Sequence, residues 1–409
     1  MTDLIRTALV IAFALRTLPL SPMSAPGPAG ECREGTQASG ALYLICLPDL
    51  RPWNGDLVIY AHGYVAFNDP IQIPDLSLPD GTSIPDLVNA LGYGFATTSY
   101  SINGLAVLEG IDDVRDLVDV FAAEVAEPDR VYLVGASEGG LVTTLAVEGY
   151  PDVFQGGLET CGPVGDFRQQ IDYWGDFRVI LDYFFPGLIP GSPVEIPSEV
   201  IDQWETVYEP AVAEAIAQDK IATTQLLSVT GAPVDPRVAD SVEQTVTGLV
   251  WYNVFATNDG RIKLGGQPYG NSIRIYRGSL MDTRLNLEVD RFVPDPAALQ
   301  EIEAHYQTSG DLTSPLVSLH TTGDPIVPYW HIREYKEKVE ATGSRHLYAY
   351  IPVRRYGHCE FKSSEVLAGF ALLVRKATGA ALEGAEKALP DADARRAFVE
   401  LARAYGAIP

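Results

Sequence analysis

Three side chains in this sequence have the types and the order that nucleophilic catalysis needs, namely Ser137, Asp324 and His358. A serine hydroxyl becomes a nucleophile when a histidine takes its proton, and a carboxylate orients that histidine. Ser137 is also the centre of a G-x-S-x-G motif that runs from Gly135 to Gly139. The sequence therefore predicts Ser137 as the nucleophile, His358 as the base and Asp324 as the orienting acid.

The segment around Ser137 predicts the local structure that such a nucleophile requires. Residues 131–134 are apolar without alternation, which indicates a buried strand. The three- and four-residue spacing over 141–148 indicates a helix. At such a strand-to-helix turn the serine backbone is strained and its hydroxyl projects, while Gly135 and Gly139 omit side chains that would collide with neighbouring elements.

The other two candidates also follow expected strands. Asp324 comes after the apolar segment 316–320 through a turn that contains glycine, and His358 comes after the segment 347–353. Open α/β sheets build their sites at the carboxyl ends of their strands. We therefore expect the three side chains to meet at one edge of a sheet.

Four other polar residues have positions that make them alternatives or neighbours of the site. Asp166 follows another expected strand, so it is an alternative acid. His320 ends a buried strand and His331 falls in an expected helix, so both are expected to be structural. His62 is expected to pack within its loop and not to act as a second base.

The predicted nucleophile also needs donors for the negative oxygen that its attack creates. The backbone N–H after the nucleophile, that of Glu138, is one expected donor. The loop His62-Gly63-Tyr64 after the apolar segment 57–61 supplies the other, through the N–H of Tyr64, with Gly63 allowing a close approach. The Glu138 side chain has a second interpretation, as an exposed helix-start residue favoured by the helix dipole.

At this point the chain resembles the α/β-hydrolase family, and within it the serine esterases and lipases. The resemblance rests on His62-Gly63, on the motif around Ser137, on Asp324 and on His358, and covers residues 40–160 and 312–378. It implies a mostly parallel sheet covered on both faces and a serine hydrolase that cleaves carboxylic esters, small or polymeric, without a metal or cofactor. A peptidase of the prolyl-oligopeptidase type and an acyltransferase remain alternatives. A non-catalytic binding protein is disfavoured because the set of three residues is complete.

The order of expected elements divides the chain into four parts. Strands and helices alternate up to about residue 161, which indicates a parallel sheet. A helical, aromatic-rich stretch then interrupts the alternation, and its aromatic segments are expected to form a core or to line a substrate pocket. A small hairpin is expected within 265–279, and one long helix over 384–405. The four expected parts are a signal or linker (1–30), the first part of the core (31–161), an inserted mainly helical cap (162–312) and the second part of the core (313–409).

Composition and the N-terminal segment restrict partners and location. The formal net charge of −25 disfavours nucleic acids and anionic membranes as partners. Residues 8–15 are apolar and follow Arg6, as in a secretion signal, and they are too few to span a bilayer as a helix. We therefore expect a secreted or periplasmic protein, or a cytoplasmic one if this segment is not a signal.

The four cysteines have no C-x-x-C spacing, which disfavours a zinc ribbon or a thioredoxin-type motif. Cys32 and Cys46 are close in sequence, which suggests a local disulfide. The segment around Cys359 resembles tannases and feruloyl esterases, in which a cysteine after the catalytic histidine is bridged to one just before the nucleophile. Here that position is Ala136, so we expect a bridge to Cys161 instead, with unpaired buried thiols as the alternative.

Overall fold

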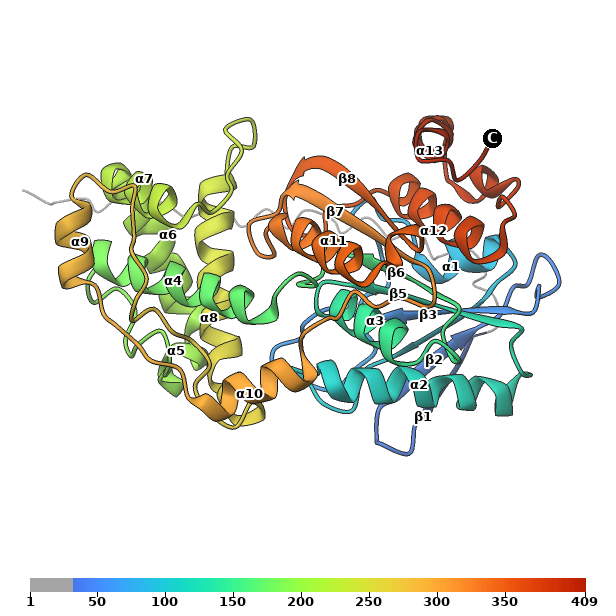
Figure 1. The fold of residues 1–409 in the computed structure, drawn as a ribbon, viewed down its shortest axis with the longest axis horizontal. Helices are drawn as coiled ribbons and strands as arrows, with labels where there is room; N and C mark the ends of the chain where they lie inside the picture. The colour runs from blue at the N-terminus through green and yellow to red at the C-terminus, as the bar shows by residue number, and fades with distance from the viewer. Residues whose placement is uncertain (1–31) are drawn as a thin grey trace, which may run out of the picture.

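The computed structural model describes residues 32–409, so the expected signal or linker at 1–30 lies outside the described residues. These residues build an eight-stranded sheet with the order β1-β2-β4-β3-β5-β6-β7-β8 (Figure 1). Neighbouring strands from β4 through β3 to β8 run parallel, while β1, β2 and β4 pair antiparallel. The strands are β1 (Cys32–Thr36), β2 (Leu42–Cys46), β3 (Asp56–Ala61), β4 (Gly94–Thr98), β5 (Arg130–Ala136), β6 (Gly156–Thr160), β7 (Leu316–Gly323) and β8 (Tyr348–Tyr356).

Helices cover both faces of this sheet, which is why its central strands lack polar alternation. The helices on one face are α2 (Val107–Glu124), α3 (Glu138–Gly149) and α11 (Trp330–Thr342). Those on the other face are α1 (Ile84–Ala90), α12 (Ser363–Thr378) and α13 (Ala392–Ala404). The expected fold class, a mostly parallel and doubly covered sheet, is confirmed.

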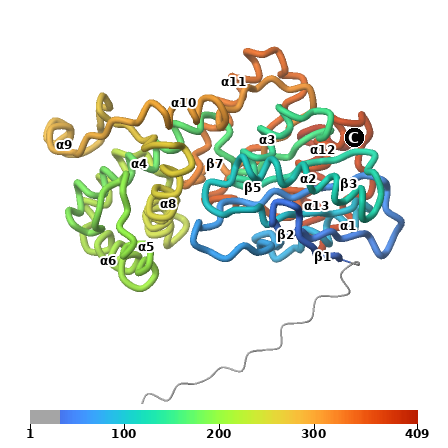
Figure 2. The backbone as a smooth tube through the Cα atoms, turned by 90° about the horizontal axis from the view of Figure 1, so that it is seen from below, coloured from blue at the N-terminus to red at the C-terminus, as the bar shows by residue number. Residues whose placement is uncertain are grey.

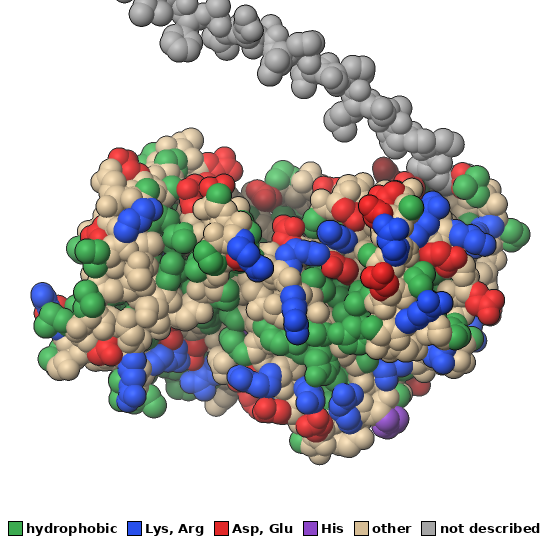
Figure 3. Space-filling view, turned by 90° about the horizontal axis from the view of Figure 1, so that it is seen from above, with side chains coloured by type: hydrophobic (Ala, Val, Ile, Leu, Met, Phe, Trp, Pro, Cys, Tyr) green, Lys and Arg blue, Asp and Glu red, His purple; other side chains and the backbone are tan. Residues whose placement is uncertain are grey.

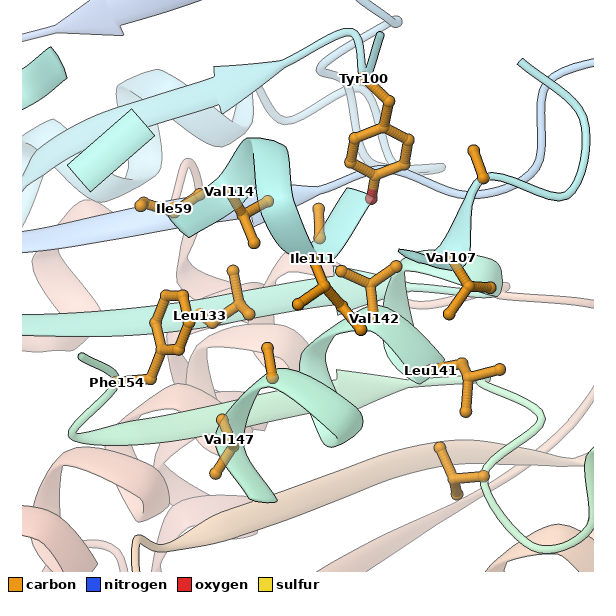
Figure 4. Close-up of a cluster of buried hydrophobic side chains, with 14 of the residues drawn as sticks. Ile59, Tyr100, Val107, Ile111, Val114, Leu133, Leu141, Val142, Val147 and Phe154 are labelled. Carbon is orange, nitrogen blue, oxygen red and sulfur yellow. The ribbon is translucent and has the colours of Figure 1, made fainter. Parts of the chain in front are cut away.

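Alternate residues of β3 show how one strand contributes to two cores. Ile59 packs with Leu133 of β5 under Ile111 and Val142 of helices α2 and α3 (Figure 4). Its neighbour Val58 points to the opposite face and joins the core under α1 and α12. Because successive side chains of a strand alternate, the residues 57–59 of β3 that lie between the two helical layers are all apolar.

A helical insertion, defined as the elements between β6 and β7, lies beside the sheet in two perpendicular views (Figures 1 and 2). It has its own hydrophobic core, whose largest fully buried side chains include Trp204, Phe177 and the stem of Arg178. The Arg178 guanidinium is held by Asp182 and Asn253. The helices of the insertion are α4 (Phe167–Phe184), α5 (Ser198–Asp202), α6 (Glu209–Gln218), α7 (Lys220–Thr230), α8 (Ser241–Lys263), α9 (Asp282–Glu288) and α10 (Pro296–His305), with a π-helical turn η1 (Trp204–Tyr208).

Two expected elements were wrong. Residues 265–279 form no hairpin, because side chains hold this backbone in an irregular path: Asp172 of α4 accepts from the N–H of Gly270 and pairs with Arg274. The expected helix 384–405 is divided into a 3-10 turn, η3 (Ala385–Ala388), and α13. Pro390 favours an extended residue before it, and Asp391 begins a new helix by capping its first turn.

The surface and helices add two observations about the environment of the chain. Acidic and basic side chains are interspersed on the face shown in Figure 3, despite the large negative net charge.

Within residues 32–409, no helix combines the length and apolar character needed to cross a bilayer.

Candidate active site

Ser137 is the single residue between β5 and α3. Its backbone has φ 56° and ψ −120°, a backbone conformation that residues with a side chain rarely adopt. The two glycines of the motif make this turn possible. A Cβ on Gly135 would collide with the carbonyl of Gly139, and one on Gly139 would collide with the carbonyl of Ala61. The turn therefore raises the Ser137 side chain above the sheet edge.

The three predicted side chains meet at this point. The imidazole Nε2 of His358 lies 2.8 Å from the Ser137 hydroxyl, and its Nδ1 lies 2.7 Å from Oδ2 of Asp324. The serine follows β5, the aspartate follows β7 and the histidine follows β8. With Nδ1–H donating to the carboxylate, Nε2 is free to accept the serine proton.

The carboxyl of Asp324 is fully buried and fixed by its own loop. Its Oδ1 accepts hydrogen bonds from the N–H groups of Ile326 (2.9 Å) and Val327 (3.0 Å), which leaves Oδ2 for His358. His320 lies 3.8 Å from the same carboxyl, and its Nε2 bonds the Val327 carbonyl. Burial lowers the pKa of His320, so this neighbour is neutral and does not compensate the Asp324 charge.

The alternative acid and the other histidines lie in different environments. Asp166 caps α4, accepting from the N–H of Gln169, and does not contact His358. His331 is buried, with Nδ1 accepting from the N–H of Gly165. His62 stacks on a tyrosine ring and bonds the carbonyl of its own neighbour.

The loop expected to supply an oxyanion donor lies directly against Ser137. A Cβ on Gly63 would stand 3.1 Å from the Cβ of Ser137. Within residues 32–409, the backbone N–H of Tyr64 has no hydrogen-bond partner. The N–H of Glu138 is the first of α3, and the first N–H groups of a helix have no partner within it. The Tyr64 side chain points to α8, where its hydroxyl donates to the Phe255 carbonyl at 3.0 Å.

The Glu138 side chain is buried, so its interpretation as an exposed helix-start residue was wrong. Its Oε1 accepts from the N–H of Ala106 at 2.6 Å. Burial raises the pKa of Glu138 to about 8, so the carboxyl is mainly protonated at neutral pH. A neutral carboxyl beside the nucleophile does not oppose a negative charge developing there.

Both expected disulfides are present. Cys161 and Cys359 are bridged, with 5.4 Å between their Cα atoms, and the bridge joins the end of β6 to the residue after His358. Cys32 and Cys46 are bridged across the β1–β2 pair. In residues 32–409, the one group of His, Cys, Asp and Glu close enough to hold a metal is Cys161, His358 and Cys359, whose sulfurs are committed to the disulfide.

Two cavities lie on either side of the Ser137–His358 pair. The first, of about 90 Å³, lies between the sheet edge and the helical insertion, and its wall includes Ser137, Tyr64, Trp174 and Tyr252. The second, of about 290 Å³, lies on the other face, between β3, β5, α1 and α12, and reaches His358. Of the expected aromatic segments, 173–177 contributes Trp174 to the first cavity.

Tyr252 is a residue that the sequence did not single out. It lies inside α8, a helix with aromatic and polar residues on several sides, and only the packing of the insertion turns this ring toward the site.

The strand order, the strained serine after β5 and the histidine and acid after later strands define an α/β-hydrolase fold. No protein-family model matches the chain. Among curated proteins it is similar to an o-phthalyl amidase of Xanthobacter agilis, with 20% identity, over 84% of this chain and 86% of that protein.

Two solved structures show the range of similar proteins. An acylaminoacyl peptidase of Pyrococcus horikoshii aligns with a TM-score of 0.42 and 12% identity, over 83% of this chain and 39% of that one. An esterase from Aspergillus oryzae aligns with a TM-score of 0.45 and 15% identity, over 84% of this chain and 78% of that one. The chain therefore spans about two fifths of the length of the acylaminoacyl peptidase that it matches.

Proposed function

We propose that the chain is a serine hydrolase that cleaves carboxylic esters, with Ser137, His358 and Asp324 as its catalytic triad. The observation that carries the proposal is the continuous path from the Ser137 hydroxyl through both ring nitrogens of His358 to the buried Asp324 carboxyl, with contacts of 2.8 and 2.7 Å. The strained backbone of Ser137 supports it, because such strain persists where function requires it.

In the proposed acylation step, the Ser137 oxygen attacks the ester carbonyl while His358 Nε2 takes the hydroxyl proton. Asp324 stabilises the imidazolium that forms. The carbonyl oxygen becomes negative and is held by the N–H groups of Glu138 and Tyr64. The intermediate collapses when His358 gives its proton to the alcohol oxygen, which leaves as the free alcohol.

Deacylation repeats the same movements with water as the nucleophile. His358 takes a proton from water, the hydroxide oxygen attacks the acyl-serine carbonyl, and the same donors hold the oxyanion. His358 then returns the proton to the Ser137 oxygen as the carboxylic acid leaves. Replacing water by an alcohol at this stage would make the chain an acyltransferase.

The two cavities beside the catalytic pair suggest where the two parts of a substrate bind. The first has aromatic walls from Tyr64, Trp174 and Tyr252, which suit an aromatic or branched apolar group. The second is larger and lined mainly by aliphatic side chains. We assign one to the acyl group and the other to the alcohol group of an ester.

The test combines active-site labelling with a substrate panel. A fluorophosphonate probe is expected to label the wild type on Ser137 and to leave Ser137→Ala unlabelled, while Ser198→Ala, at an exposed helix start, labels normally. With p-nitrophenyl esters, Ser137→Ala is expected to lose about 10⁴- to 10⁶-fold in kcat. An unlabelled wild type would overturn the proposal.

Amide hydrolysis is the second candidate, because the similar protein of Xanthobacter agilis is named as an amidase. The same triad can cleave amides when the leaving nitrogen receives a proton from His358. A higher kcat/KM for acyl or aminoacyl anilides than for the matched esters would favour this alternative, and cleavage inside peptides would favour a peptidase.

We also propose that the chain works in an oxidising compartment, outside the cytoplasm. The support is the pair of disulfides, which persist in secreted and periplasmic proteins and are rare in the cytosol. Fractionation of the source cells, with non-reducing mass analysis of the chain, tests this proposal.

A further inference from the structure

Tyr252 is a side chain of the helical insertion that lies close to the Ser137–His358 pair. Its ring centroid lies 6.5 Å from that of His358, with the rings nearly perpendicular, and Tyr252 and Ser137 line the same cavity. It lies 5.9 Å from the ring of Tyr64, whose backbone N–H is the second expected oxyanion donor. The Tyr252 ring therefore lines the same cavity as Ser137 and has the rings of His358 and Tyr64 as neighbours.

The Tyr252 ring is held in this position by its neighbours. One face stacks on Trp174 at 4.9 Å between centroids and 21° between planes. The Trp174 Nε1–H donates to the Ile326 carbonyl at 3.0 Å, and Ile326 belongs to the loop that fixes Asp324. Tyr252 is thus attached through Trp174 to the same loop as the catalytic acid, so its hydroxyl does not need to be reordered when a substrate binds.

The hydroxyl of Tyr252 differs from those of the tyrosines around it. Tyr64 donates to the Phe255 carbonyl, Tyr173 to the Pro325 carbonyl and Tyr356 to the Ser241 carbonyl. Within residues 32–409, the Tyr252 hydroxyl has no carbonyl or carboxylate acceptor, although its residue lines the cavity that holds Ser137. A polar group with this placement has its hydrogen available for a substrate atom.

The protonation state of Tyr252 fits a donor. Burial, together with the nearby carboxyl of Asp324, raises the pKa of the phenol far above its ordinary value. The phenol therefore keeps its proton at neutral pH.

We propose that the Tyr252 hydroxyl donates a hydrogen bond to the carbonyl oxygen that becomes negative when Ser137 attacks, as a third donor beside the N–H groups of Tyr64 and Glu138. This inference rests on the proposed serine hydrolase function. It makes the helical insertion part of the catalytic machinery, because the two backbone donors come from the start of α3 and the loop after β3, and the third comes from α8. Tyr252 is a catalytic residue in this scheme because it touches the reacting oxygen.

The test is Tyr252→Phe, which removes the hydroxyl and keeps the ring that stacks on Trp174. Removing one oxyanion donor typically costs 10²- to 10³-fold in rate, and with two donors remaining we expect a loss of about 10- to 100-fold in kcat/KM. KM should change by less than about twofold. Tyr183→Phe removes a tyrosine hydroxyl elsewhere in the insertion and should leave kcat/KM unchanged.

An arylboronic acid separates oxyanion binding from simple packing, because it forms a tetrahedral anion on the serine. Its inhibition constant is expected to weaken by the same factor as kcat/KM in Tyr252→Phe. If the probe labels the wild type but kcat/KM and boronic acid affinity of Tyr252→Phe each fall by less than twofold, the role of Tyr252 is overturned. The serine hydrolase function is not affected by that result. A loss seen with alkyl esters but not with p-nitrophenyl esters would place Tyr252 on the leaving group and would also overturn its role as an oxyanion donor.

Two further measurements keep the test decisive. A wild type that fluorophosphonate does not label would overturn the serine hydrolase function and this inference with it. If Tyr252→Phe does not fold, as judged by its melting curve, a fluorinated tyrosine at position 252 retains the ring and makes the phenol a stronger donor. Tighter boronic acid binding by that protein supports the proposal, and unchanged binding overturns it.

Discussion

The sheet and the helical insertion contribute to the candidate site in different ways. In the sheet, Ser137, Asp324 and His358 each come a few residues after a strand, so the parallel register alone brings them to one edge. In the insertion, Tyr252 lies in the middle of a helix, and its position depends on contacts with Trp174 and Tyr64, which are distant in sequence. The local sequence pattern therefore determines where Ser137, Asp324 and His358 lie, whereas the tertiary packing of the insertion determines where Tyr252 lies.

The largest expected effect tests the sheet half. Asp324→Asn should lower kcat by about 10⁴-fold, because an amide holds the wrong tautomer of His358. Asp166→Asn is the matched control: it changes a helix cap, so we expect near-normal kcat and a loss of at most about 1 kcal/mol in stability. Steady-state kinetics of both variants decide the assignment, and the reverse pattern would move the acid to Asp166.

The two disulfides allow a comparison within the sheet half. The Cys161–Cys359 bridge closes a separation of 198 residues and adjoins His358, whereas Cys32–Cys46 closes 14 residues at the sheet edge. Chain-entropy arguments give upper values of about 5 and about 3 kcal/mol for the two loops. Replacing Cys161 and Cys359 by alanine should therefore lower the unfolding free energy more than replacing Cys32 and Cys46.

Only the first of these double variants should also reduce kcat, because only that bridge holds the histidine loop. Urea unfolding and esterase kinetics on both proteins make the comparison. Equal kcat values in the two double variants would show that the bridge stabilises the fold without positioning His358.

Buried acids differ between the regions. In the insertion, Asp176 bonds Arg274. In the sheet half, Glu159 has no cation partner among residues 32–409, and burial raises its pKa to about 8. The unfolded chain releases this proton near pH 4.5 and the folded chain near pH 8, so the folded state binds more protons between these values. Stability should therefore fall as pH rises through this window, by a few kcal/mol at about 1.4 kcal/mol per pKa unit.

Glu159→Gln should reduce this decline, and the exposed Glu400→Gln should not. Urea unfolding at pH 5, 7 and 9 measures the difference. Glu138, whose pKa is also raised to about 8 by burial, should supply part of the slope that remains. The same slope in wild type and Glu159→Gln would mean that Glu159 is ionised in the folded protein at neutral pH.

The smallest expected effect concerns the contact between the two regions. Tyr64→Phe removes the hydrogen bond to the Phe255 carbonyl but keeps the backbone N–H of residue 64. We expect a loss of about 1 kcal/mol in stability and only a few-fold decrease in kcat. A decrease of a hundredfold or more would mean that the hydroxyl, and not the backbone, stabilises the oxyanion.

Much of the sheet could be predicted from sequence because its signals are local. The apolar segments at 57–61 and 131–134 are continuous, which indicates strands covered on both faces, and the glycines around Ser137 have a steric reason. The antiparallel strands β1 and β2 were not predicted as a pair. They are short, and β1 is largely exposed and polar, so it has no apolar pattern.

The insertion could be predicted only as a helical region. The segment 265–279 has residues typical of a hairpin, but ion pairs and side-chain bonds to α4 hold it in another shape. Nothing in the sequence near Tyr252 distinguishes it from Trp251, its neighbour in α8, because which ring faces the site depends on how α8 sits against α4 and the Tyr64 loop.

The hydrogen bond from Tyr64 to α8 has a consequence for how this protein can diverge. Its acceptor is a main-chain carbonyl, so a mutation at position 255 changes the side chain and leaves the bond in place. The link therefore constrains the path of the helix and one tyrosine of the loop, and leaves the side chain at position 255 free to vary. Descendants of this chain can acquire new pocket walls without losing the attachment, whereas a helix that rotates about its axis, so that this carbonyl faces away from the loop, cannot keep it.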